Sequence, residues 1–340
     1  MRPWLQGDFD GASRLYGEYA EWLPEMGRRF LVDMELERAH YRSCAELLKE
    51  AGNKDEPGVM MRRARLLYLT RDIREAEATA HKCGLKQALR VALHLSNTLA
   101  LVRLERGEYQ EAIEQFGGMV KLPKKAETKI DEPEIILALN GMALGYLGAH
   151  QLDAATHYAG LALEFSKNSW EDTSIPALDS LATLSRVQIE QHDFQKAHES
   201  LNKCAQGRQK LYGAGNPKIA EVLELEAKFD MLTGDAHQAL PLASQAVAMR
   251  QVIASSQNPW PERRLQTRAQ TCAAQGYWPA RALLTLGNAY AATGDQGKAA
   301  QCFDNAIPIL EGELGADALV VQQARARRGT LRPTPAAVNP

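Results

Sequence analysis

The chain carries six pairs of small residues in which the two members lie twelve positions apart and the second is always Ala. The pairs are Ala64/Ala76, Ala100/Ala112, Ala143/Ala155, Ser185/Ala197, Ala227/Ala239 and Gly287/Ala299. Small side chains at this spacing let two antiparallel helices, joined by a tight turn, approach closely where they cross. A unit that recurs along the chain predicts an array of helix hairpins, each packed on its neighbours.

The residues around each second-helix Ala support this interpretation. Five positions before it, where the turn is expected, three of the six copies have Gly: Gly107, Gly234 and Gly294. Gly closes a helix end in the left-handed conformation without steric cost. The other three turn positions are Arg71, His150 and His192.

An apolar stripe follows in each second helix, at four and seven positions after the Ala, the spacing of one buried helix face. The stripe consists of Ala80, Cys83, Phe116, Met119, Ala159, Ala162, Leu201, Cys204, Ala243, Ala246, Phe303 and Ala306.

Two stretches, 107–116 and 286–299, resemble tetratricopeptide repeats. The second-helix Ala residues are 36, 43, 42, 42 and 60 positions apart, against a usual period near 34 in that family. The steps of 42, together with the Gly- and Pro-containing loop 211–217, resemble the kinesin-light-chain-like bacterial subclass. This resemblance covers about residues 58–330 and implies an all-α fold, a right-handed α-α superhelix of the tetratricopeptide type.

The expected domain organisation follows from this repeat pattern. Residues 1–57 are expected to hold partial and degenerate repeats, because the start reads as a turn and second helix without a first helix. Residues 58–330 form the superhelix, with an insertion near 252–279 and a capping helix near 316–328. Residues 331–340 are expected to be a disordered tail. By resemblance, the half repeat suggests the C-terminal sensor or docking region of a larger regulator.

Composition and motifs argue against several classes of function. The net charge of −2 lacks the basic excess of a dedicated nucleic-acid binder, and no apolar run reaches the length of a membrane span. Five widely spaced cysteines suit a reducing cytoplasm. The phosphate-binding, dinucleotide-binding, serine-hydrolase and zinc-protease motifs are missing. We therefore expect a cytoplasmic protein that is not an enzyme, with no catalytic residues, cofactor or metal site.

The first helices of such an array line its concave surface. Their inward-facing positions lie three before and one after the small crossing residue. From these we predict the following peptide-binding residues: Arg65, Asn97, Asn140, Arg186, Lys228 and Asn288. An Asn amide both donates to and accepts from an extended backbone, and Arg can hold a carboxylate with two hydrogen bonds. The alternative is that these are ordinary solvated residues, with Glu224 and Lys228 forming an i,i+4 pair.

The sequence thus predicts a non-catalytic scaffold that binds a protein or peptide segment in its concave groove, without nucleic-acid or membrane partners. The alternative is a ligand- or peptide-responsive module of a signalling kinase or transcriptional regulator. The identity of the partner, the pathway and the oligomeric state are left open by the sequence.

Overall fold

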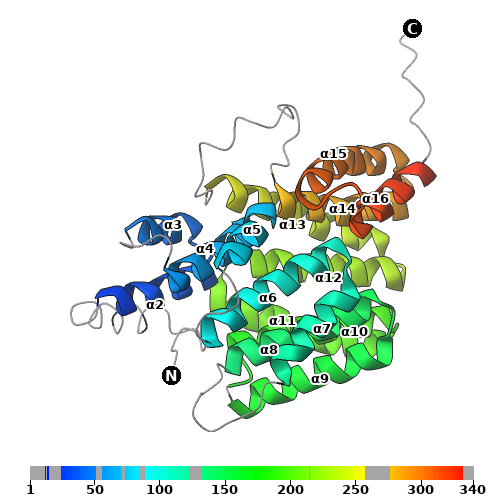
Figure 1. Ribbon diagram of the computed structural model, residues 1–340. Coiled ribbons are helices and arrows are strands. Elements are labelled where there is room, and N and C mark those ends of the chain that lie inside the picture. The colour runs from blue at the N-terminus through cyan, green and yellow to red at the C-terminus, as the bar shows by residue number, and fades with distance from the viewer. Residues whose placement is uncertain are drawn as a thin grey trace. The chain divides into compact units, whose positions relative to one another are not determined.

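The computed structural model describes residues 24–50, 56–70, 73–83, 89–121, 132–169, 171–213, 215–256 and 276–331, together with the single positions 12 and 14. Within these ranges the regular structure is α-helical and no strand occurs, so the predicted all-α class is confirmed (Figure 1). The chain divides into two compact units, residues 1–214 with 257–259, and residues 215–256 with 260–340.

The helices of the first unit follow one another as antiparallel neighbours. They are α2 (Pro24–Glu37), α3 (Tyr41–Lys49), α4 (Pro57–Thr70), α5 (Ile73–Cys83), α6 (Leu89–Arg106), α7 (Tyr109–Val120), α8 (Glu132–Gly148), α9 (Leu152–Ser169), α10 (Ile175–Glu190) and α11 (Phe194–Tyr212). Each of α4, α6, α8 and α10 packs against the helix that follows it. These four helices also contact one another in sequence, so the first helices of the repeats form a continuous wall.

The second unit repeats the pattern on a smaller scale. Its helices are α12 (Pro217–Thr233), α13 (Ala236–Ser256), α14 (Tyr277–Ala292), α15 (Gln296–Leu314) and α16 (Leu319–Thr330). Helix α16 packs on α15 and begins three residues after Ala316.

The small residues lie at the helix crossings, as predicted. All twelve members of the six pairs are buried, and Ala143 and Ala155 of α8 and α9 have no exposed surface. The twelve stripe residues are buried as well. Two of them, Phe116 and Phe303, fill the space beside small residues of the facing first helix. The periodic pattern therefore describes the core of both units.

The turns between the paired helices also follow the prediction. Gly107, Gly234 and Gly294 have φ values of 83°, 97° and 88°. His150 and His192 occupy the equivalent position with φ values of 58° and 59°, in the left-handed region that non-glycine residues rarely adopt. Both histidines are therefore turn residues.

The less regular parts of the chain are described only in part. Within the degenerate region 1–57, α2 and α3 form a short hairpin ahead of α4. The expected half repeat at the start, the turn residue Arg71, most of the insertion near 252–279 and the tail 332–340 lie outside the described residues. No helix in the described ranges is both long enough and apolar enough to cross a membrane.

Candidate functional site

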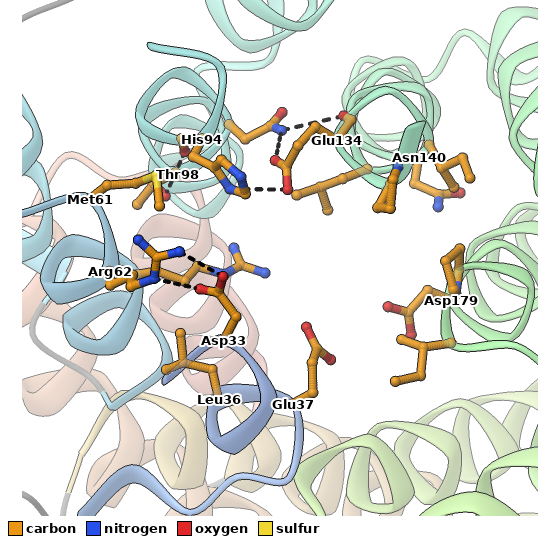
Figure 2. Close-up of a pocket in the computed structure, with 17 residues that line it drawn as sticks. Asp33, Leu36, Glu37, Met61, Arg62, His94, Thr98, Glu134, Asn140 and Asp179 are labelled. Carbon is orange, nitrogen blue, oxygen red and sulfur yellow. Dashed lines mark hydrogen bonds and ion pairs between the residues drawn. The ribbon is translucent and has the colours of Figure 1, made fainter. Parts of the chain in front are cut away.

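A cavity of about 130 Å³ lies within the first unit, beside the wall of first helices. Residues of α4, α6, α8 and α10 are arranged around it, and residues of α2 border it from below in the view of Figure 2. Glu37 of α2 and Asp179 of α10 point into this space from different sides. The cavity is therefore lined by five helices, one from each of four successive repeats and one from the N-terminal hairpin.

Helix α2 contacts both α4, the first helix of the wall, and α10, the last one in this unit. Asp33 accepts two hydrogen bonds from the Arg62 guanidinium of α4, at 2.8 and 2.7 Å. Met34 belongs to an apolar cluster with Ile175 of α10, and Tyr212 of α11 packs against the same cluster. Helix α2 thus links the first repeat of the wall to the last one in this unit.

A buried carboxylate connects α6 to α8 at the cavity. Glu134, in the first turn of α8, lies 3.0 Å from Nδ1 of His94 and accepts from Nδ2 of Asn97 at 2.6 Å. Burial alone would raise the pKa of Glu134. The nearby His94, the hydrogen bonds from His94 and Asn97, and the charge of Arg65 outweigh burial and lower the pKa to about 2. Glu134 is therefore ionised at neutral pH.

The next pair of first helices is joined by a neutral version of this contact. Nδ2 of Asn140 on α8 donates to Oγ of Ser180 on α10 at 3.1 Å. The Ser180 hydroxyl in turn donates to the carbonyl of Pro176 at 2.9 Å. Asn97 and Asn140 are 1% and 6% exposed, so neither is an ordinary solvated surface residue.

The two arginines of the cavity differ in their partners. Arg62 is neutralised by Asp33, whereas Arg65 has no ion pair with any residue that the structure describes. The Arg65 guanidinium lies 5.6 Å from the centre of the Tyr68 ring, within the range of a cation–π contact. Its Nη1 is buried without a hydrogen-bond partner in the described part of the chain.

The structure brings together three of the six residues predicted to bind a peptide. Arg65, Asn97 and Asn140 line the same cavity. Arg186 lies on α10, half-buried and outside the lining of this cavity. Lys228 and Asn288 lie on α12 and α14 of the second unit and are also half-buried.

Reasoning from the sequence missed the residues that position the two asparagines, Glu134 and Ser180. One signal was present: they follow Asn97 and Asn140 by 37 and 40 positions, about one repeat. A polar residue one repeat beyond a groove Asn lies on the neighbouring first helix, within reach of its amide. The contribution of α2 had no comparable signal, because it precedes the regular repeats.

The aromatic residues near the insertion serve the core of the second unit. Tyr277 has no exposed surface, and its ring meets Trp278 edge to face at 4.8 Å between ring centres. The Arg250 guanidinium lies 5.4 Å from the Trp278 ring. Trp260 lies outside the described residues.

The cysteines of the described regions are buried thiols. Burial raises the pKa of Cys302 to about 11 and raises that of Cys44 further, so both thiols stay protonated near neutral pH. The residues placed by the structure contain no group of three His, Cys, Asp or Glu side chains that could hold a metal ion.

Comparison with solved structures identifies the fold. A Rap protein complexed with Competence and Sporulation Factor matches with a TM-score of 0.62 and 15% identity, over 89% of this chain and 81% of that one. BtubC (BKLC) from P. vanneervenii matches with a TM-score of 0.46 and 18% identity, over 84% and 97%. A tetratricopeptide repeat protein from Parabacteroides merdae matches with a TM-score of 0.37 and 12% identity, over 82% of this chain and 100% of that one.

The chain therefore has a tetratricopeptide-like helical repeat fold, as the sequence predicted. No protein-family model matches the sequence, and no curated protein matches it.

Proposed function

We propose that this protein is a non-catalytic interaction scaffold and that the cavity of its first unit binds an extended segment of a partner protein or peptide. One observation carries the proposal. Arg65, Asn97 and Asn140 line one cavity, and each has a buried polar atom, Nη1 or Oδ1, without a hydrogen-bond partner in the described structure. Since buried polar atoms are normally hydrogen-bonded, three such atoms on residues around one cavity favour a ligand whose binding reorients these side chains and completes their hydrogen bonds.

The three residues lie on successive helices of the wall: α4, α6 and α8. Neighbouring packed helices are about 8–10 Å apart, and an extended chain rises about 3.3 Å per residue. A segment of about six residues would therefore reach all three. An extended backbone also presents both N–H and C=O groups along its length, which match two acceptors and one donor.

Arg65 supplies the charge preference. Because it has no carboxylate partner among the residues described, it is available to an acidic side chain or a terminal carboxylate of the bound segment. Ion pairs with Arg are strongest when both N–H groups of the fork reach the carboxylate. Arg186, Lys228 and Asn288 would contact further parts of a longer partner, each within its own unit.

The similarity to the Rap protein supports the proposal only at the level of fold. That protein was solved with Competence and Sporulation Factor bound, so a protein of this fold can hold a partner.

The test is affinity capture from the native cell extract with full-length protein. The Asn97→Ala, Asn140→Ala double variant should lose the captured partner, while Asn202→Ala, which removes an exposed Asn of α11, should retain it. Circular dichroism and the thermal midpoint would show whether each variant is folded. A folded double variant that captures the same partners as the wild type would contradict the proposal.

A further inference from the structure

We propose that the hairpin of α2 and α3, residues 24–49, is a gate on the cavity: it closes against α10 and opens as one body to admit or release an occupant. The entry of an occupant through this gate rests on the proposed function. The opening of the gate does not, and it can be measured in the protein alone.

The closed cavity is too small for the segment that is proposed to bind in it. Its volume of about 130 Å³ is close to that of an engineered cavity of about 150 Å³ that admits benzene, whereas sites for larger ligands measure about 300–1,000 Å³. Six residues of extended chain are far larger than benzene. One of the five lining helices therefore has to move before such a segment can enter.

The packing of the lining helices indicates that α2 is the one that moves. Each of α4, α6, α8 and α10 packs on the second helix of its own repeat and on an adjacent first helix of the wall. Helix α2 packs on α3 and α4, borders the cavity with Asp33, Leu36 and Glu37 (Figure 2), and meets α10 through a small apolar cluster. This cluster consists of Ala12, Met34 and Ile175, with Leu31, Leu211 and Tyr212 packed against it. The junction of α2 with α10 is the smallest contact that the structure describes between neighbours around the cavity.

The gate has the internal structure of a complete repeat. Val32 and Cys44 lie twelve positions apart, like the small-residue pairs, and both are buried; Cys44 Sγ lies 3.7 Å from the Val32 carbonyl oxygen. Ala39, at the turn, has a φ of 60°. The backbone N–H groups at 39 and 40 donate to carbonyls three and five positions earlier, as they do at the turn of His150. Because its core and its turn lie within the hairpin, the gate can move without unfolding.

Two adjacent residues of α2 hold the gate shut. Asp33 accepts two hydrogen bonds from Arg62 of α4, and Met34 contributes to the cluster with α10. Helix α3 also packs on α4, so the gate stays attached along α3 when α2 leaves the cavity.

The ion pair of the closed gate can be exchanged for one with the occupant. Arg62 also donates to the Gly58 carbonyl of its own helix at 3.0 Å, so its guanidinium is held in place after Asp33 has left. An acidic group of an entering segment can then take the position of Asp33, one helical turn from Arg65. Opening of the gate and entry of an acidic segment are thereby coupled through one guanidinium.

The first experiment measures the opening of the gate in the free full-length protein by thiol labelling. Ile175→Cys places a reporter thiol in the junction, where Ile175 is 3% exposed. The native thiols of Cys204 in α11 and Cys44 in the gate have no exposed surface and report unfolding. N-ethylmaleimide labels the thiols, and mass spectrometry of the peptides gives each rate, which is divided by the rate of the same thiol in urea-unfolded protein.

The reporter thiol should react at least 10-fold faster than Cys204 and Cys44, because a local opening requires less free energy than unfolding. Asp33→Asn and Met34→Ala should each accelerate the reporter at least 10-fold further. Two controls should leave its rate unchanged: Met34→Leu, which conserves volume, and Asp304→Asn, which removes an exposed ion pair of the second unit.

The other outcomes of the labelling experiment would overturn the gate. Equal rates for the reporter and Cys204 would show that the junction opens only when the protein unfolds. A reporter that reacts as fast as in urea would show that the junction is not closed. Labelling of Cys44 at the reporter's rate would show that the hairpin unfolds rather than moving as one body, and unchanged rates in Asp33→Asn and Met34→Ala would show that these residues do not hold it.

The second experiment tests whether entry requires the open gate. The double variant Met34→Cys, Ile175→Cys is bridged with dithiobis(maleimidoethane), whose central disulfide is cleaved by dithiothreitol, so that one sample is measured locked and then released. The immobilised protein is offered capped hexapeptides rich in Asp and Glu. Released protein should retain at least 10-fold more peptide than locked protein. The same bridge in Asp304→Cys, Arg328→Cys, at an exposed ion pair of the second unit, should make no difference to retention.

The outcomes of the second experiment separate the gate from the proposed function. Equal or greater retention by the locked protein would overturn entry through the gate. Retention by neither form would contradict the proposed function and, with it, the entry of a segment, while the labelling rates would still decide whether the gate opens.

Discussion

The ring of Phe116 on α7 occupies the space in which a side chain on Gly141 of α8 would begin. A Cβ built on Gly141 would lie 2.3 Å from Cζ of Phe116, and Phe116 has no exposed surface. This contact sets how closely α7 and α8 approach, next to Asn140, which lines the cavity. The packing of the core and the position of a candidate site residue are thus linked at adjacent positions of α8.

Replacing Gly141 with Ala should therefore lower the stability of the first unit. The new methyl group would displace the Phe116 ring in a packed core, at a cost of about 1–3 kcal/mol. Gly160→Ala on α9 is the matched control, because a Cβ there would meet nothing within 4 Å; it should stabilise by about 0.5–1 kcal/mol. Urea unfolding followed by circular dichroism measures both changes. Equal midpoints for the two variants would contradict the packing argument.

The Arg62–Asp33 contact should determine how firmly α2 is held on the wall. Arg62 is 6% exposed, so Asp33→Asn removes a carboxylate from a buried guanidinium, a change that costs up to about 3 kcal/mol. Hydrogen exchange of the α2 amides should become faster. Asp304→Asn removes the partner of exposed Arg328 and should leave the exchange unchanged. Unaltered α2 exchange in Asp33→Asn would show that other contacts hold the helix.

The contribution of Glu134 to the stability of the folded protein should depend on pH in a defined direction. Its pKa is lowered to about 2 from an ordinary value of 4.5, so the unfolded chain binds a proton at higher pH than the folded protein does. The stabilisation is therefore fully present above about pH 4.5 and is lost as the pH falls towards 2.

Glu134→Gln should be less stable than the wild type at pH 7, and the difference should shrink below pH 4.5. Thermal melts between pH 7 and pH 3 measure this difference, with Glu132→Gln as the control for removing an exposed charge. A difference between wild type and Glu134→Gln that stays constant over this range would contradict the depressed pKa.

The turn at His150 should favour Gly. Its φ of 58° is strained for a residue with a Cβ, and more so for a β-branched one. His150→Gly should stabilise by about 0.5–1 kcal/mol, and His150→Val should destabilise. Denaturation midpoints that rank Val above Gly would contradict the assignment of His150 as a left-handed turn residue.

The helical hairpins could be predicted because their determinants recur locally. The pair Ala100/Ala112 and the stripe residue Phe116 follow from spacing within one hairpin, and Gly107 marks its turn. Burial at each of these positions is decided by neighbours that the repeat itself supplies. The faces of the first helices could be assigned for the same reason, which is how Arg65, Asn97 and Asn140 were chosen.

The rest of the site depends on contacts between repeats, which the pattern within one hairpin does not contain. Glu134 holds the Nδ2 end of the Asn97 amide, yet it lies at the start of α8, the first helix of the following repeat. Asp33 belongs to α2, which lies outside the regular repeats. It is held at the cavity by its ion pair with Arg62, which lies 29 positions later in the sequence. Arg186 shares the predicted face but lies outside the cavity lining, which includes Asp179 earlier on the same helix.

The decisive measurement is a crystal structure of the full-length protein bound to the segment that it captures from its native extract. The segment should lie extended in the cavity of the first unit, in contact with the side chains of Asn97 and Asn140, with an acidic group at Arg65. A partner bound to the outer, second-helix face, with this cavity unchanged and empty of it, would contradict the proposed site.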